Sequence, residues 1–167
     1  MGQKEMNGEV DYTAFRRVLA EVLPRGRVAE MKNYFSHSDV TVYRHCIRVA
    51  FAAYTFAVRH RIKCNLGALV RGALLHDYYL YDWHDKNKGF RWHGFKHHRF
   101  ALANAERDFD LCDTERDIIG SHMFPLTFWR VPHCREAWLV TLADKKVAAE
   151  ETLRKYRLCK ERKKQEE

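Results

Sequence analysis

The sequence lacks the segments that would place a protein in a membrane or direct it out of the cell. Its longest apolar stretch, VAFAAYTFAV, has ten residues and ends before Arg59, which is too short to span a bilayer. The first residues, MGQKEMNGEVDYT, contain no apolar core of a signal peptide. Residue 6 is Met6, where a myristoylation signal carries Ser or Thr. We therefore expect a cytoplasmic protein with no membrane partner.

Paired cysteines are also missing. The five cysteine residues include no Cys-x-x-Cys pair, and their number is odd. This pattern argues against both a disulfide framework and a cysteine zinc site. It predicts reduced thiols.

The sequence has no internal repeat and no strand-like alternation of apolar and polar residues, which excludes the β classes. At 167 residues the chain is long enough for one domain with a substantial core. The class predicted is all-α.

Helices are expected over 11–23, 27–35, 38 or 39 to about 62, 66–76, 97–109, 113 or 114 to 122, and from 133 onward, with Asn65 capping the fourth. Residues 78–96 are expected to form an ordered loop. We divide the chain into N-terminal helices (1–37) that pack on a core domain (38–155), and a charged tail (156–167).

What the sequence does contain is a set of histidines and aspartates inside apolar helical stretches. They occur in the segments RHCIRVA, LLHDYY, HGFKHHRF, IGSHMFP and LADKKVA. A charged or imidazole group in such surroundings is costly unless it has a partner. The residues concerned are His45, His76, Asp77, His97, His122 and Asp144.

Each of these residues has an ordinary structural explanation when it is considered alone. His45 suits a hydrogen-bonded core histidine, Asp77 a capping or ion-paired carboxylate, and His122 a contact with a helix C-terminus. Asp144 suits a salt bridge to Arg44 or Arg48. Together, however, imidazoles and carboxylates on several core helices are typical ligands of a divalent transition metal.

The basic residues are concentrated in one region. Residues 43–100 contain eleven Lys or Arg and three acids, so the whole formal charge of +8 lies there. Such a region attracts a phosphorylated substrate. A solvated surface or a nucleic-acid patch explains it equally well.

These segments, in this order, resemble the HD-domain superfamily of metal-dependent phosphohydrolases. His45, His76-Asp77 and Asp144 match the family pattern, and the added His97 and His122 are similar to its dinuclear subgroup. RHCIRVA, ALLHDYYLYDWH, HGFKHHRFALANAERDF, HMFPLT and LADKKVA resemble bacterial HD-domain hydrolases over residues 43–150. The glycine-tyrosine-proline signature of cyclic di-GMP enzymes is absent, which disfavours cyclic dinucleotides as substrates.

The resemblance implies a single-domain helical bundle of the HD type with a metal centre. His45, His76, Asp77 and Asp144 would surround one divalent ion. His97 and His122 would complete a second site, with Asp77 between the two. His93 and His98 lie close to His97 in sequence and are alternatives to it. One or two ions of Mn, Fe, Zn or Ni would serve as cofactor.

The activity implied is hydrolysis of a phosphate monoester or diester, with a nucleotide or small phosphate ester as substrate. Asp77 would orient the attacking water. Lys145 and Arg48 are candidates to contact phosphate, with an ion pair to an acid as the alternative for Arg48. Trp83, Phe90 and Trp92 are candidates to stack on a base, and the alternative for them is to pack the loop against the domain. The alternative is a non-catalytic module that binds nucleotides or nucleic acid through region 43–100.

Overall fold

A computed structural model of the chain describes residues 10–36, 39–83 and 92–166, with side chains as far as residue 162. The described residues form helices, with a single isolated bridge between Phe35 and Thr41 in place of any strand. The all-α prediction is therefore confirmed. The elements are α1 (Thr13–Val22), η1, a 3-10 helix (Val28–Asn33), α2 (Val42–Arg59), α3 (Leu66–Leu75), α4 (His93–Asp108), α5 (Asp113–Ser121) and α6 (Arg135–Glu166).

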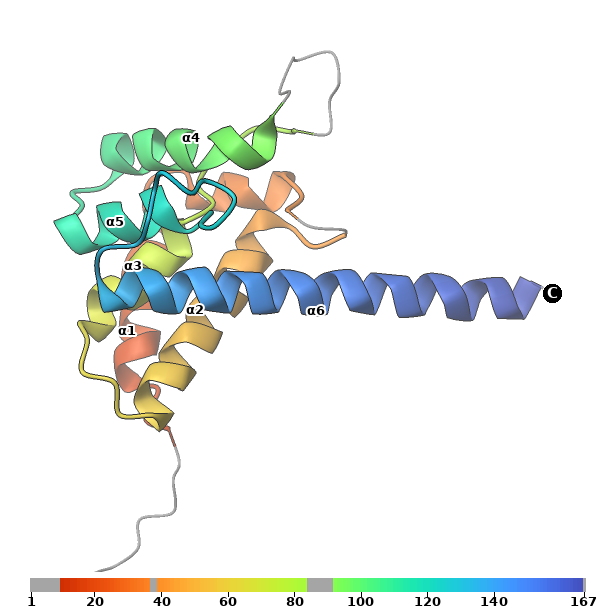
Figure 1. The fold of residues 1–167 in the computed structure, drawn as a ribbon, viewed down its shortest axis with the longest axis horizontal. Coiled ribbons are helices and arrows are strands. Elements are labelled where there is room, and N and C mark those ends of the chain that lie inside the picture. Colours follow the sequence, from red (N-terminus) through yellow and green to blue (C-terminus); the bar gives the residue numbers. More distant parts are fainter. Residues whose placement is uncertain (1–9, 37–38, 84–91, 167) are drawn as a thin grey trace, which may run out of the picture.

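Helix α3 lies at the centre of the bundle. Its sequence LGALVRGALL is apolar on nearly every face, and most of its side chains are buried. It packs against α1, α2, α5 and α6, which together surround it (Figure 1). The Asn65 side chain accepts a hydrogen bond from the Ala68 amide, so the predicted cap is confirmed. Because α3 is enclosed, polar groups at its C-terminal end lie inside the protein.

Helix α2 begins later than predicted. Its N-cap is Thr41, whose hydroxyl accepts from the Arg44 amide, rather than Ser38 or Asp39. The Phe35–Thr41 bridge, together with a bond from the Val42 amide to the Tyr34 carbonyl, holds Thr41 in an extended conformation. The helix can start only after this bridge.

Helix α4 begins earlier than predicted, at His93 rather than His97. The extra turn has no side-chain cap and follows Trp92, which has a left-handed backbone conformation with φ of 69°. It is stabilised instead by stacking of the His93 ring on the His97 ring one turn later, at 4.7 Å. The rest of the predicted 78–96 loop lies partly outside the described residues, including 84–91.

Helix α6 is the longest element, and its N-terminal half packs on α2 and α5. Its C-terminal half extends beyond the other helices (Figure 1). The helix continues without a break from the proposed core domain into the charged tail, as far as Glu166. No helix in the described part of the chain has the length and apolar character needed to cross a membrane. None of the five cysteines forms a disulfide.

Candidate metal centre

A close contact between α3 and α5 brings two histidines together. A Cβ atom on Gly72 would lie 2.6 Å from Cδ1 of Ile118, so only glycine permits this approach. One helical turn later on each helix stand His76 and His122, whose ring centroids are 4.9 Å apart. His76 follows Gly72 by four residues on α3, and His122 follows Ile118 by four residues on α5. The close contact of the two helices therefore brings the two imidazoles together.

Both of these histidines are also the C-cap residues of their helices, α3 and α5. The C-terminus of a helix carries a partial negative charge, because its last carbonyl groups have no partners within the helix. Two such ends meeting at one point favour a cation there.

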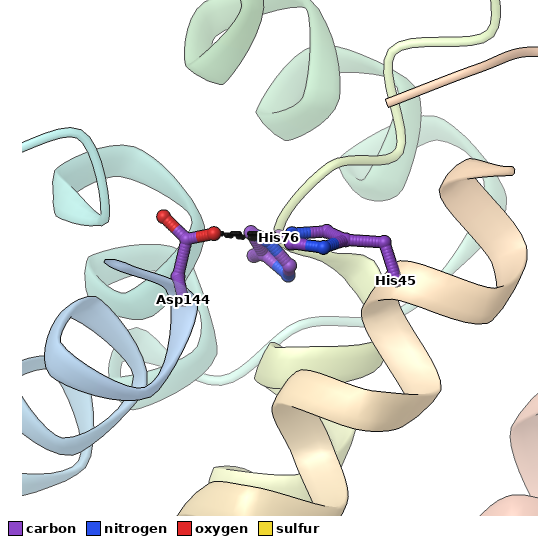
Figure 2. Close-up of side chains that lie close together, drawn as sticks. All are labelled: His45, His76 and Asp144. Atoms are coloured by element: carbon purple, nitrogen blue, oxygen red, sulfur yellow. Dashed lines mark hydrogen bonds and ion pairs between the residues drawn. The ribbon is translucent and has the colours of Figure 1, made fainter. Parts of the chain in front are cut away.

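A first group of three ligand atoms comes from α2, the end of α3 and α6. The side chains of His45, His76 and Asp144 point toward one another (Figure 2), and all three are buried. Nε2 of His45 lies 3.0 Å from Oδ1 of Asp144, and Nε2 of His76 lies 3.7 Å from the same oxygen. The mutual distances are compatible with a shared metal ion.

A second group lies beside the first and shares His76. It comprises His76, Asp77 and His122, again buried and compatible with a metal ion. His97 of α4 adjoins it: its Nε2 is 2.9 Å from Nε2 of His122 and 3.2 Å from Oδ1 of Asp77. The residues expected around two ions therefore all lie together in the structure.

The hydrogen bonds at Nδ1 determine which nitrogen of each ring is unprotonated and offers its lone pair to the cluster. Nδ1 donates to a backbone carbonyl in three of the rings: to Ala73 at 2.7 Å from His76, to His93 at 3.1 Å from His97, and to Ile119 at 2.9 Å from His122. A carbonyl can only accept, so in each neutral ring the proton sits on Nδ1. All three Nε2 atoms then present lone pairs to the centre, the arrangement in which histidine ligates metal.

In the neutral rings lone pairs therefore face lone pairs, and a cation between them, either a proton or a metal ion, would satisfy them. Nε2 of His76 and Oδ1 of Asp77 are buried and make no hydrogen bond of acceptable geometry with any described group. Nε2 of His97 and of His122 can share only one proton across their 2.9 Å separation. A buried acceptor without a donor is costly. The imidazole and carboxylate set fits a divalent transition metal better than Mg²⁺ or Ca²⁺.

The ionisation of the cluster reflects the same crowding. Burial alone would lower the pKa of His45, but hydrogen bonds with Asp144 and Glu151 outweigh it and raise the pKa to about 10. Burial lowers the pKa of His122 to about 4. The pKa of Asp77 and that of Asp144 fall well below their usual range, because neighbouring imidazoles outweigh the effect of burial. Both carboxylates are therefore ionised and ready to ligate.

A cavity of about 650 Å³ opens onto the cluster, a size typical of small-ligand sites. One part of its wall is polar, and the other is aromatic or aliphatic. Lys145 stands in the polar part, where its ammonium donates to the His122 carbonyl at 2.7 Å and to Asp144 at 3.0 Å. Two of its three protons are thus used. The residues that line the cavity are Ser36, Asp77, Tyr79, Trp83, Trp92, His93, Gly94, His97, His122, Met123, Leu126, Asp144, Lys145 and Ala148.

The three histidines in the first two turns of α4 have different surroundings. His97 joins the cluster, whereas Nδ1 of His93 is bonded to the Tyr81 hydroxyl at 2.9 Å. His98 is buried, and neither of its ring nitrogens has a hydrogen-bond partner among the described residues. Burial lowers the pKa of His98 to about 3. Of the three, His97 is the one whose Nε2 lies close to both His122 and Asp77.

Arg48 forms ion pairs with acids, which was the alternative to a contact with phosphate. Its guanidinium forms ion pairs with Glu151 at 2.7 Å and Glu150 at 3.3 Å, and it is absent from the cavity wall. An arginine three residues after His45 satisfies an acid instead. We do not include it among the proposed substrate contacts.

The aromatic residues considered for stacking on a base also differ in their surroundings. Trp83 stacks on His93 at 4.7 Å and donates to the Phe35 carbonyl, so it packs the loop against the domain. Trp92 remains 67% exposed and lines the cavity. Phe90 lies outside the described residues.

Glu151 is a residue of this centre that the sequence reasoning missed. Its Oε2 lies 3.0 Å from Nδ1 of His45, and its side chain is fully buried. The signal was its position seven residues after Asp144, on the same face of one helix.

The fold and the site together define an all-helical protein with adjoining histidine and aspartate groups suited to divalent metal. The profile of the HD domain matches residues 42–149, about two-thirds of the chain. The chain therefore belongs to the HD-domain family, whose members are in general metal-dependent hydrolases. No curated protein and no solved structure in the comparisons matches the chain. The match includes all six ligand candidates and ends before Glu151.

Proposed function

We propose that this protein is a metal-dependent phosphohydrolase that acts on a nucleotide or another small phosphate ester, with two divalent ions in adjoining groups. The observation that carries the proposal is the position of Asp77. One of its oxygens lies 3.2 Å from His97 and 3.4 Å from His122. The other lies 3.8 Å from His76 and 4.0 Å from His45. A carboxylate between two groups of imidazoles is suited to bridging.

Divalent ions at such a centre would neutralise phosphoryl charge and lower the pKa of water. The protein's own residues would supply position and specificity. Asp77 would orient the attacking water through a carboxylate oxygen. Lys145, held by the His122 carbonyl and Asp144, would direct its remaining proton at a phosphate oxygen or at the leaving oxygen.

The apolar part of the cavity would hold the organic part of the substrate. Trp92, Met123 and Leu126 line it beside the polar cluster. An exposed indole offers a flat face for a nucleobase, and such stacking contributes about 1–3 kcal/mol per base. The cavity of about 650 Å³ suits a mononucleotide or a compound of similar size. A cytoplasmic location fits this substrate class.

The test is a panel of phosphomonoesters and phosphodiesters, assayed with the metal-free protein and after loading with Mn²⁺, Fe²⁺, Zn²⁺ or Ni²⁺. We expect hydrolysis that requires one of these ions and is abolished in the Asp77→Asn variant. A protein that takes up no metal and binds oligonucleotides with a steep salt dependence would refute the proposal. That result would favour a non-catalytic binding module.

A further inference from the structure

A buried carboxylate holds the far side of the His45 ring, the side turned away from the metal cluster. Nδ1 of His45 lies 3.0 Å from Oε2 of Glu151, while Nε2 of the same ring lies 3.0 Å from Oδ1 of Asp144. The two acids are seven residues apart on α6, which is two helical turns. One face of one helix thus presents a carboxylate to each nitrogen of a single imidazole.

The carboxylate of Glu151 is itself satisfied by two donors. Besides His45, it accepts from Nη1 of Arg48 at 2.7 Å. The Glu151 side chain is 0% exposed, whereas that of Arg48 is 39% exposed. A buried charge is tolerated when it is paired and hydrogen-bonded. Arg48 therefore extends from solvent to neutralise an acid whose other oxygen faces His45.

We infer that Glu151 is a positioning residue, which holds His45 with its proton on Nδ1 and its Nε2 lone pair directed at the metal cluster, while Arg48 balances the buried charge. The inference rests on the metal-dependent function proposed above. The other three histidines are fixed by backbone carbonyls, which no side-chain substitution removes. His45 alone among these four depends on a side chain for this bond. Loss of a partner that orients a ligand typically weakens metal affinity by about 10–100-fold.

Glutamine at this position would test the inference with little change in shape. Its single amide oxygen cannot accept from both Arg48 and His45, because its amino group would face one of these donors. The matched control is Glu150→Gln. Glu150 is 49% exposed and pairs with Arg48 and Lys146.

The experiment is a competition titration of the metal-free protein with Zn²⁺ or Mn²⁺ and a chromophoric chelator. Folding is checked by circular dichroism. In Glu151→Gln we expect the ion at the His45, His76 and Asp144 group to bind about 10–100-fold more weakly, with the adjoining ion unaffected. Glu150→Gln should match the wild type. Equal affinities for wild type and a folded Glu151→Gln would overturn the inference and leave the proposed function standing. Failure of the wild type to bind metal would overturn both.

A measurement on the wild type covers the case in which Glu151→Gln does not fold. Protein labelled with ¹⁵N-histidine and loaded with Zn²⁺ reveals by NMR which nitrogen of each ring carries the proton. We expect His45 to carry it on Nδ1 and to bind metal through Nε2. The opposite tautomer would overturn the inference.

Discussion

Replacing Asp77 by asparagine removes the group that joins the two halves of the centre while nearly preserving its volume. One carboxylate oxygen becomes an amide nitrogen, which cannot ligate a metal. Because the two oxygens lie beside different imidazoles, at 3.2 Å from His97 and 3.8 Å from His76, either orientation of the amide deprives one group. The variant should therefore bind metal much more weakly than the wild type.

The magnitude follows from the linkage between binding and stability. At a free metal concentration of 100 times the wild-type Kd, one bound ion stabilises the folded protein by about 2.7 kcal/mol. A loss of about hundredfold in affinity, the upper end for residues that merely orient a ligand, is a lower bound for losing a ligand itself. The same metal concentration then stabilises the variant by only about 0.4 kcal/mol. At about 2–4 °C per kcal/mol for a domain of this size, Tm should rise by about 5–11 °C in the wild type and by under about 2 °C in the variant.

The assay is thermal unfolding followed by circular dichroism, with each protein measured in chelator and at the same free Zn²⁺ or Mn²⁺. The chelator samples separate any change in intrinsic stability from the loss of metal binding. A rise in Tm for Asp77→Asn equal to that of the wild type would refute the assignment of Asp77 as a shared ligand.

Three further substitutions have directions that the structure determines. Gly72→Ala should destabilise the fold by about 1–3 kcal/mol through the clash between α3 and α5, and should weaken metal binding, as measured by urea unfolding and metal titration. Lys145→Met should lower kcat/KM for a phosphate ester by about 10–100-fold, the value of one hydrogen bond to a charged group. Burial opposes ionisation of Asp117, but hydrogen bonds from the backbone amides of His133 and Cys134 outweigh it and lower the pKa of Asp117 below 3.8. The stability that ionised Asp117 contributes is therefore complete above pH 3.8, and it is lost as the pH falls through the pKa of Asp117 in the folded protein. Asp117→Asn should cost about 1–3 kcal/mol at pH 7 and progressively less in acid, by urea unfolding.

Neighbouring residues supply matched controls for the first two of these substitutions. A Cβ on Gly67, also in α3, would meet only Oδ1 of Asn65 at 3.4 Å, so Gly67→Ala should leave stability nearly unchanged. Lys146 follows Lys145 but is 72% exposed and outside the main cavity wall. Lys146→Met should therefore retain wild-type kcat/KM. Equal effects at either pair of positions would contradict the reasoning.

The helices and most ligand candidates were predictable because their signals are local. An apolar run such as LGALVRGALL predicts a buried helix, and a His-Asp pair at its end predicts polar groups in the core. The convergence of His45, His76 and Asp144 is different, because these residues lie far apart in the sequence. Their order matched a known family, and that resemblance carried the prediction.

Tertiary contacts account for what the local pattern left open or missed. The spacing of Arg48 suited either a phosphate contact or an ion pair with an acid, and Glu151, about a hundred residues later, forms that ion pair. The start of α4 is set by ring stacking, since this turn has no capping side chain. Such contacts depend on which helices pack together, which periodicity along one helix does not reveal.

The central claim is that these imidazoles and carboxylates come together around divalent metal. Crystals of the protein grown with Mn²⁺ or Zn²⁺ and measured at the absorption edge of that metal test it most directly. The account predicts anomalous density between His45, His76 and Asp144, and a second peak beside His97 and His122. Density absent from both places at saturating metal, with the side chains bonded only to one another, would contradict it.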